Sequence, residues 1–100
     1  MQRISLVERA VARDLRGARI IALVQIGYEE HPRKDESLHF YKEWSFIVAW
    51  ERSDQCGTHR VQVNNDEESM CISGVYDLKR EEALLNFIER SQINTMAHSH

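Results

Sequence analysis

Apolar residues near the start of the chain recur with the period of an α-helix. Ser5 and Glu8 have the spacing of a capping box, and Gly17 supplies the left-handed residue that commonly ends a helix. The sequence therefore predicts a helix over residues 6–16. Its apolar stripe, at three- and four-residue spacing, consists of Ile4, Leu6, Val7, Ala10, Val11 and Leu15.

The next two segments show the patterns of strands. Residues 18–28 are rich in β-branched residues and apolar on both faces, which is usual for a central strand with something packed on each side. Residues 38–50 alternate with a period of two, and the break at Lys42 suggests a bend or bulge. A charged turn at residues 31–36 separates the two segments, so we expect a long antiparallel hairpin.

The second half of the chain continues this strand pattern and then returns to a helix. Its expected parts are a turn at 53–58, a short strand at Val61 and Val63, a polar hairpin tip at 64–69, a strand over 70–76 with a bulge at Gly74, a helix over 78–92 and a frayed tail at 93–100. Asp77 is the expected N-cap of that helix. Its predicted buried face contains Leu78, Leu84, Leu85 and Ile88, helped by Phe87.

This order predicts one domain over residues 1–100. We expect an α+β fold, a two-layer sandwich of helix, four-stranded antiparallel meander and helix, with both helices on one sheet face. The other face would then expose an apolar patch, which is commonly a partner surface. The patch would contain Ile21, Leu23, Tyr41, Ile47 and Ala49. Two alternatives stay open: the helices lie on opposite faces, or the strand register is wrong by one residue.

The composition limits the class of protein. With 100 residues, 42% hydrophobic and 29% charged, and with one Pro and four Gly, the chain is neither disordered nor repetitive. Its longest apolar runs, Ile20–Val24 and Phe46–Trp50, fall far short of the roughly 20 residues of a membrane span. No secretory signal follows Met1, so we expect a cytoplasmic protein in which Cys56 and Cys71 stay thiols.

Candidate chemistry is sparse. Cys56 and His59 have the spacing of half a zinc site, and with Cys71 they form an alternative metal site, but a second ligand pair is missing. As a catalytic couple, Cys56 and His59 would lie on an open turn. Adjacent carboxylates are typical of a solvated surface, and no Gly-rich loop precedes a helix. We therefore expect no enzyme activity, no cofactor and no metal.

Three arginines on the first helix favour a different alternative. Arg9, Arg13 and Arg16 fall at i, i+4 and i+7 and could contact phosphates. The helix–strands–helix order resembles the double-stranded-RNA-binding module. That family enters its last helix through a basic segment, whereas residues 77–82 here are mixed and acidic, and the net charge is −3. Nucleic-acid binding is therefore kept only as the alternative.

By elimination, the sequence favours a small non-catalytic module that recognises another protein. An inhibitor, an immunity or counter-defence factor, and an accessory subunit all fit this class. The acidic tip formed by Asp66, Glu67 and Glu68 would steer a basic partner. Its apolar contact residues would be Ile21, Leu23, Tyr41 and Ile47. Self-association through three of them, Ile21, Leu23 and Ile47, would give a homodimer.

Overall fold

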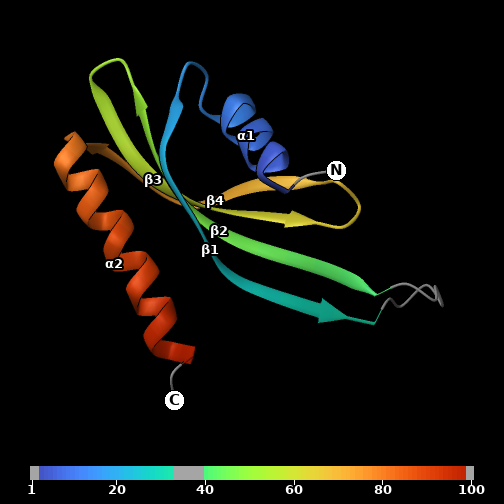
Figure 1. Cartoon of the computed structure of the whole chain (residues 1–100). Helices are drawn as coiled ribbons and strands as arrows, with labels where there is room; N and C mark the ends of the chain where they lie inside the picture. Colours follow the sequence, from blue (N-terminus) through green and yellow to red (C-terminus); the bar gives the residue numbers. More distant parts are fainter. Residues whose placement is uncertain (1–2, 33–39, 99–100) are drawn as a thin grey trace.

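The computed structural model describes residues 3–32 and 40–98. Its elements are α1 (Arg3–Asp14), β1 (Arg19–His31), β2 (Tyr41–Arg52), β3 (Gln55–Asn64), β4 (Ser69–Leu78) and α2 (Arg80–His98) (Figure 1). The strands form one antiparallel sheet in the order β1-β2-β3-β4, so the predicted α+β class and element order are confirmed. None of the described helices is long and apolar enough to cross a membrane. Most of the turn predicted at 31–36 lies outside the described residues.

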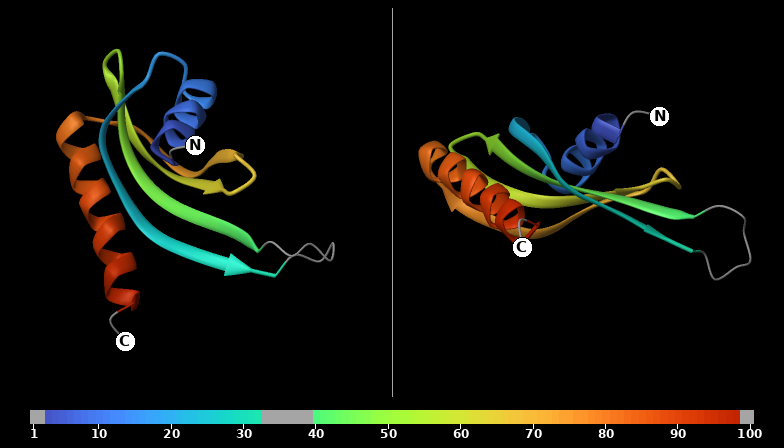
Figure 2. Two further views of the ribbon diagram at one scale, coloured as in Figure 1. Left: turned by 45° about the vertical axis from the view of Figure 1, so that its right-hand side comes forward. Right: turned by 60° about the horizontal axis from the view of Figure 1, so that its bottom comes forward.

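The two helices lie on opposite faces of the sheet (Figure 2, right-hand view). Successive strand residues point to opposite faces, and the core under α1 takes Phe46, Val48 and Trp50 from β2. The residues between them, Ile47 and Ala49, are 2% and 0% exposed on the face that α2 covers. The expectation that both helices share one face, leaving Ile47 and Ala49 uncovered, is therefore wrong. The alternative with one helix on each face of the sheet is correct.

Helix α1 buries most of its predicted stripe. It starts at Arg3 instead of residue 6, so Ser5 lies within the helix and not at its cap. Ile4 remains 51% exposed because it lies beside the groove between α1 and β1. Gly17 adopts the predicted left-handed conformation after the helix, with φ of 82°. The buried residues of the stripe are Leu6, Val7, Ala10, Val11 and Leu15.

Strand β1 is an edge strand, not a central one. It pairs only with β2, in the long predicted hairpin, and its two-sided apolar pattern reflects the helices on both faces. The expected irregularity at Lys42 is absent from the β1–β2 register, where Lys42 pairs regularly with Glu30. The bulges fall instead on β1, at Ile21 and Ile26.

Strand β4 carries two extra residues relative to β3. Single β3 residues, Gly57 and His59, face two β4 residues each, and Ser73 and Asp77 at these bulges have positive φ. Gly74 lies in the first bulge, as predicted. A Cβ there would lie 2.2 Å from Nε2 of His59, so the close approach requires glycine.

Helix α2 differs from its prediction at both ends. Leu78 still pairs with Cys56 in the sheet, so the cap falls at Lys79, whose backbone N–H donates to Glu82. The helix continues to His98 because no Gly or Pro follows Gly74 in the sequence. Leu85 and Ile88, predicted to be buried, are 61% and 47% exposed. The helix instead presents Ala83, Asn86, Phe87 and Arg90 toward the sheet.

Candidate functional site

The sheet face under α2 has a covered half and an open half. In Figures 1 and 2 the C-terminal end of α2 lies away from the far ends of β1 and β2. Cross-strand pairing places Glu29, Glu43 and Asn64 in one row on this open half. Two carboxylates directly opposite each other on neighbouring strands repel. The open half of the face is therefore polar and acidic, not the apolar patch that the sequence suggested.

A pocket of about 270 Å³ opens on this half of the face. Its volume lies just below the range of about 300–1,000 Å³ typical of small-molecule sites. The pocket is therefore too small for a large cofactor. We call it the acidic pocket, and its walls are Tyr41, Glu43, Gln62, Val63, Asn64, Glu68, Ser69 and Met70.

The two carboxylates of the acidic pocket are held by neutral donors. The Tyr41 hydroxyl and the Gln62 amide each donate to Glu43, both at 3.2 Å. The Asn64 amide donates to the Tyr41 hydroxyl at 3.3 Å and to Glu68 at 3.0 Å. Neither Glu43 nor Glu68 forms an ion pair with a basic side chain in the described residues. The pocket thus presents two oriented negative charges that no basic side chain of the described part of the chain pairs with.

Two asparagines fix the β3–β4 turn that forms one wall of this pocket. Asn64 Oδ1 accepts the backbone N–H groups of Asp66 and Glu68, at 2.9 and 3.0 Å. Asn65 ties the turn to the start of β2, accepting from the Lys42 backbone N–H at 2.9 Å. Sequence reasoning missed these roles. The signal was the Asn-Asn pair itself, because asparagine side chains bond nearby backbone in turns.

The residues predicted to contact a partner are only partly brought together. Tyr41 and Glu68 line the acidic pocket, and Asp66 and Glu67 are exposed on the turn next to it. Ile47 is buried beneath α2 and cannot contact a partner. The other two, Ile21 and Leu23, are half-buried on the edge strand β1, away from the pocket.

The arginines of the nucleic-acid alternative do not form one free stripe. Arg13 donates to the Asp14 carboxylate at 2.8 Å and to the Ser69 carbonyl oxygen at 2.9 Å. The bond to Asp14 raises the pKa of Arg13 and lowers the pKa of Asp14. Arg9 is exposed on α1, whereas Arg16 is exposed in the turn after the helix, which ends at Asp14. The middle member of the series is thus held by this protein's own groups.

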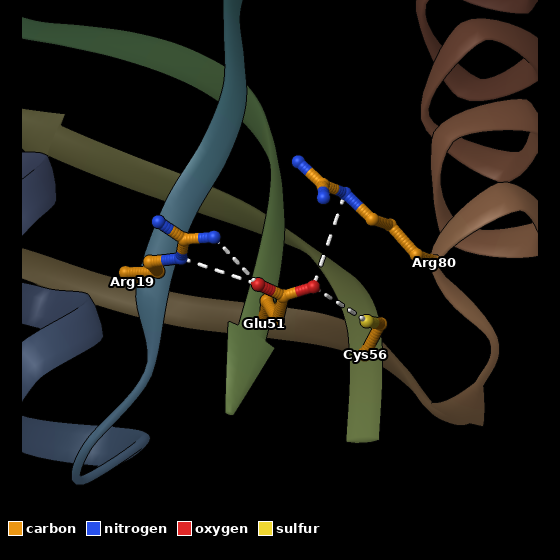
Figure 3. A network of polar contacts seen from close by, with 4 residues as sticks. All are labelled: Arg19, Glu51, Cys56 and Arg80. Atoms are coloured by element: carbon orange, nitrogen blue, oxygen red, sulfur yellow. Dashed lines mark hydrogen bonds and ion pairs between the residues drawn. The ribbon is translucent and has the colours of Figure 1, made fainter. Parts of the chain in front are cut away.

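Cys56 belongs to a polar network that joins three strands and α2 (Figure 3). Arg19 donates to the Glu51 carboxylate at 2.8 Å, and Arg80 approaches it at 3.8 Å. The Cys56 thiol donates to the same carboxylate at 3.9 Å. Burial, followed by the charge of Glu51, raises the pKa of Cys56. A protonated thiol beside a carboxylate is neither an activated nucleophile nor a ready metal ligand.

His59 and Cys71, the other members of the zinc alternative, have different surroundings. The Trp50 indole N–H donates to His59 Nδ1 at 2.9 Å, and His59 Nε2 lies 2.9 Å from the Tyr76 hydroxyl, so both ring nitrogens are engaged. Burial raises the pKa of Cys71 to about 11, with a further contribution from Asp14. Among residues 3–32 and 40–98, no three His, Cys, Asp or Glu side chains are grouped to hold a metal ion.

Comparisons of this chain with protein-family models, with curated proteins and with solved structures find no significant match.

Proposed function

We propose that this protein is a small non-catalytic interaction module that binds a basic segment of another protein at the acidic pocket. The observation that carries the proposal is the pair Glu43 and Glu68, held in one concave site by neutral hydrogen-bond donors. A guanidinium or ammonium group would supply the positive charge that this site lacks.

The surrounding charges support a basic partner. Glu29 lies directly across the strand pair from Glu43, and Asp66 and Glu67 are exposed on the adjoining turn. Acidic groups at the rim accelerate the approach of a positively charged partner. Arg60 is the basic residue of β3 closest in sequence to the pocket residue Gln62. Its guanidinium donates to Ser45 Oγ at 3.2 Å, and Ser45 is the residue of β2 that pairs with Gln62. The acidic field of the pocket is thus only partly balanced.

The preorganised walls also support binding over catalysis. The bonds of Asn64 and Asn65 hold the β3–β4 turn against β2, so ordering this wall adds little entropic cost to binding. Both thiols lie beside carboxylates and both nitrogens of His59 are engaged, which leaves no activated Cys–His couple in the described part of the chain. The free thiols Cys56 and Cys71 suit a reducing, cytoplasmic setting.

A matched pair of peptides tests this proposal. We would titrate ¹⁵N-labelled protein with blocked Gly-Arg-Gly and with blocked Gly-citrulline-Gly, which has the same shape without the charge. The arginine peptide should bind with a Kd on the order of 1 mM, as expected for a single side chain, and should shift the backbone amides of Glu43, Gln62 and Asn64. The citrulline peptide should bind at least about five-fold more weakly.

Charge-neutralising variants localise the binding. Glu43→Gln and Glu68→Gln should each weaken the binding of the arginine peptide by about five-fold, because each variant removes one negative charge from the pocket. Glu67→Gln is the matched control, since Glu67 lies on the same turn but does not line the pocket. Equal binding of the two peptides, or equal effects of Glu67→Gln and Glu43→Gln, would contradict the proposed function.

A further inference from the structure

An apolar groove of about 450 Å³ runs between α1 and the edge strand β1. It arises because α1 packs more closely on β3 and β4 than on β1. Tyr28, on the same sheet face further along β1, is 45% exposed. The apolar walls of the groove are Ile4, Val11, Ala12, Ala18, Ile20 and Leu23. One strand therefore lines an open apolar groove and carries a half-exposed aromatic ring, which packs on Trp44 at 5.4 Å between centroids.

The outer edge of β1 is self-complementary. When two copies pair antiparallel about a two-fold axis at Val24, Arg19 of each copy lies opposite Glu29 of the other. Arg19 donates to Glu51, and Glu29 lies 3.1 Å from His31 Nε2, yet both side chains remain 69% exposed. Both lie on the α2 face, opposite Glu51 and Glu43 respectively. The pairing would thus create two symmetric ion pairs between copies.

The same register places the aromatic ring at the groove. Ile20 would lie opposite Tyr28 of the second copy, and both residues are on the α1 face, since they pair with Trp50 and Trp44. A bulge reverses the face on which the following residues lie. Because β1 has one bulge on each side of Val24, at Ile21 and Ile26, Ile20 and Tyr28 still lie on the same face. Tyr28 of each copy would then cover the Ile20 end of the other copy's groove.

We propose that this protein forms a homodimer by antiparallel pairing of β1 with β1 of a second copy, centred on Val24. The two sheets become one eight-stranded sheet, and β1, which has only β2 as a neighbour in the described sheet, gains a second neighbouring strand. The acidic pocket lies toward the opposite edge of each sheet, so the dimer neither needs nor blocks it.

Cross-linking at the two-fold axis tests the register. Residues directly opposite in antiparallel strands have Cα atoms about 4.5–5.5 Å apart, which is within the range of a disulfide. Val24→Cys should therefore give an oxidised covalent dimer. Gln25→Cys is the matched control, because Gln25 would lie opposite Leu23 of the second copy, and it should cross-link at least about ten-fold less.

Sedimentation velocity from about 1 to about 500 µM measures the association itself. Wild type should dimerise in this range, and Glu29→Arg should weaken the dimer about ten-fold, because two attractive pairs become repulsive. Glu67→Arg, the same charge change at the β3–β4 turn, should have no effect. A wild-type monomer throughout, equal cross-linking of the two cysteine variants, or equal effects of the two arginine variants would overturn the proposal. These experiments measure association only, and peptide binding at the acidic pocket is measured separately with Glu43→Gln and Glu68→Gln.

Discussion

Gly74→Ala should destabilise the protein through a single contact. The added Cβ would lie 2.2 Å from His59 Nε2, 2.7 Å from Cε1 and 2.8 Å from Cδ2. The imidazole is 4% exposed and is held on both sides, by the Trp50 indole and by the Tyr76 hydroxyl, each at 2.9 Å. The ring is therefore buried and fixed by a hydrogen bond at each nitrogen.

The cost follows from the movement that the new methyl group demands. Ordinary contact starts at 3.4 Å, so the ring must withdraw by about 1.2 Å, which breaks at least one of its hydrogen bonds. Overpacking of a core costs about 1–3 kcal/mol, and a lost buried hydrogen bond about 1 kcal/mol. We expect a loss of about 3 kcal/mol in the free energy of unfolding. For a domain of this size, that loss lowers Tm by about 12–24 °C.

A double-mutant cycle, with urea unfolding followed by tryptophan fluorescence, isolates this contact. In a His59→Ala background the methyl group enters vacated space, so Gly74→Ala should then cost less than about 0.5 kcal/mol. Gly27→Ala is the matched control, because a Cβ at Gly27 meets only Ser45 Cβ, at 3.8 Å. An equal loss in both backgrounds, or no loss in wild type, would refute the reasoning.

Two further predictions test other parts of the structure. Burial, followed by the charge of Arg90, lowers the pKa of His59 below its ordinary 6.5, so the unfolded chain takes up this proton first as the pH falls. The free energy of unfolding should therefore decrease as the pH drops through 6.5, by at most about 1.4 kcal/mol per pH unit. His59→Gln should lack this contribution to the slope in chemical denaturation, and an unchanged slope would count against it. Separately, Ile47→Ala should cost about 2–4 kcal/mol, because α2 buries this side chain, whereas Leu85→Ala, 61% exposed, should cost less than about 0.5 kcal/mol. Equal values in thermal or urea unfolding would mean that α2 does not cover Ile47.

Local signals in the sequence determined most of the elements. The period of α1, the left-handed Gly17, the β1–β2 hairpin and the bulge at Gly74 each depend on a few neighbouring residues, and each is present in the structure. Helix ends were less accurate. The cap of α2 moved from Asp77 to Lys79 because the pairing of Leu78 with Cys56 extends β4, and that pairing is not local.

The candidate site shows the same division. The sequence indicated Tyr41 and the acidic tip, since exposed carboxylates and tyrosine are recognisable by residue type. It did not indicate Glu43, Gln62 or Asn64, because their position in one pocket with Glu68 requires the registers of β2, β3 and the turn together.

Only the tertiary structure decided which face each helix covers. A strand that is apolar on both sides fits two arrangements: a helix on each face, or helices on one face and a partner surface on the other. The hydrophobic effect is non-directional, so the sequence pattern alone does not distinguish between these arrangements. Contacts between residues distant in sequence determine the arrangement. Thr58 on β3 donates to Asn86 and accepts from Arg90, both on α2, and these bonds hold the helix over Ile47 and Ala49. The amino-acid pattern thus specified the helices, the strands and their order, whereas side-chain packing between remote segments determined the exposed surface available for binding.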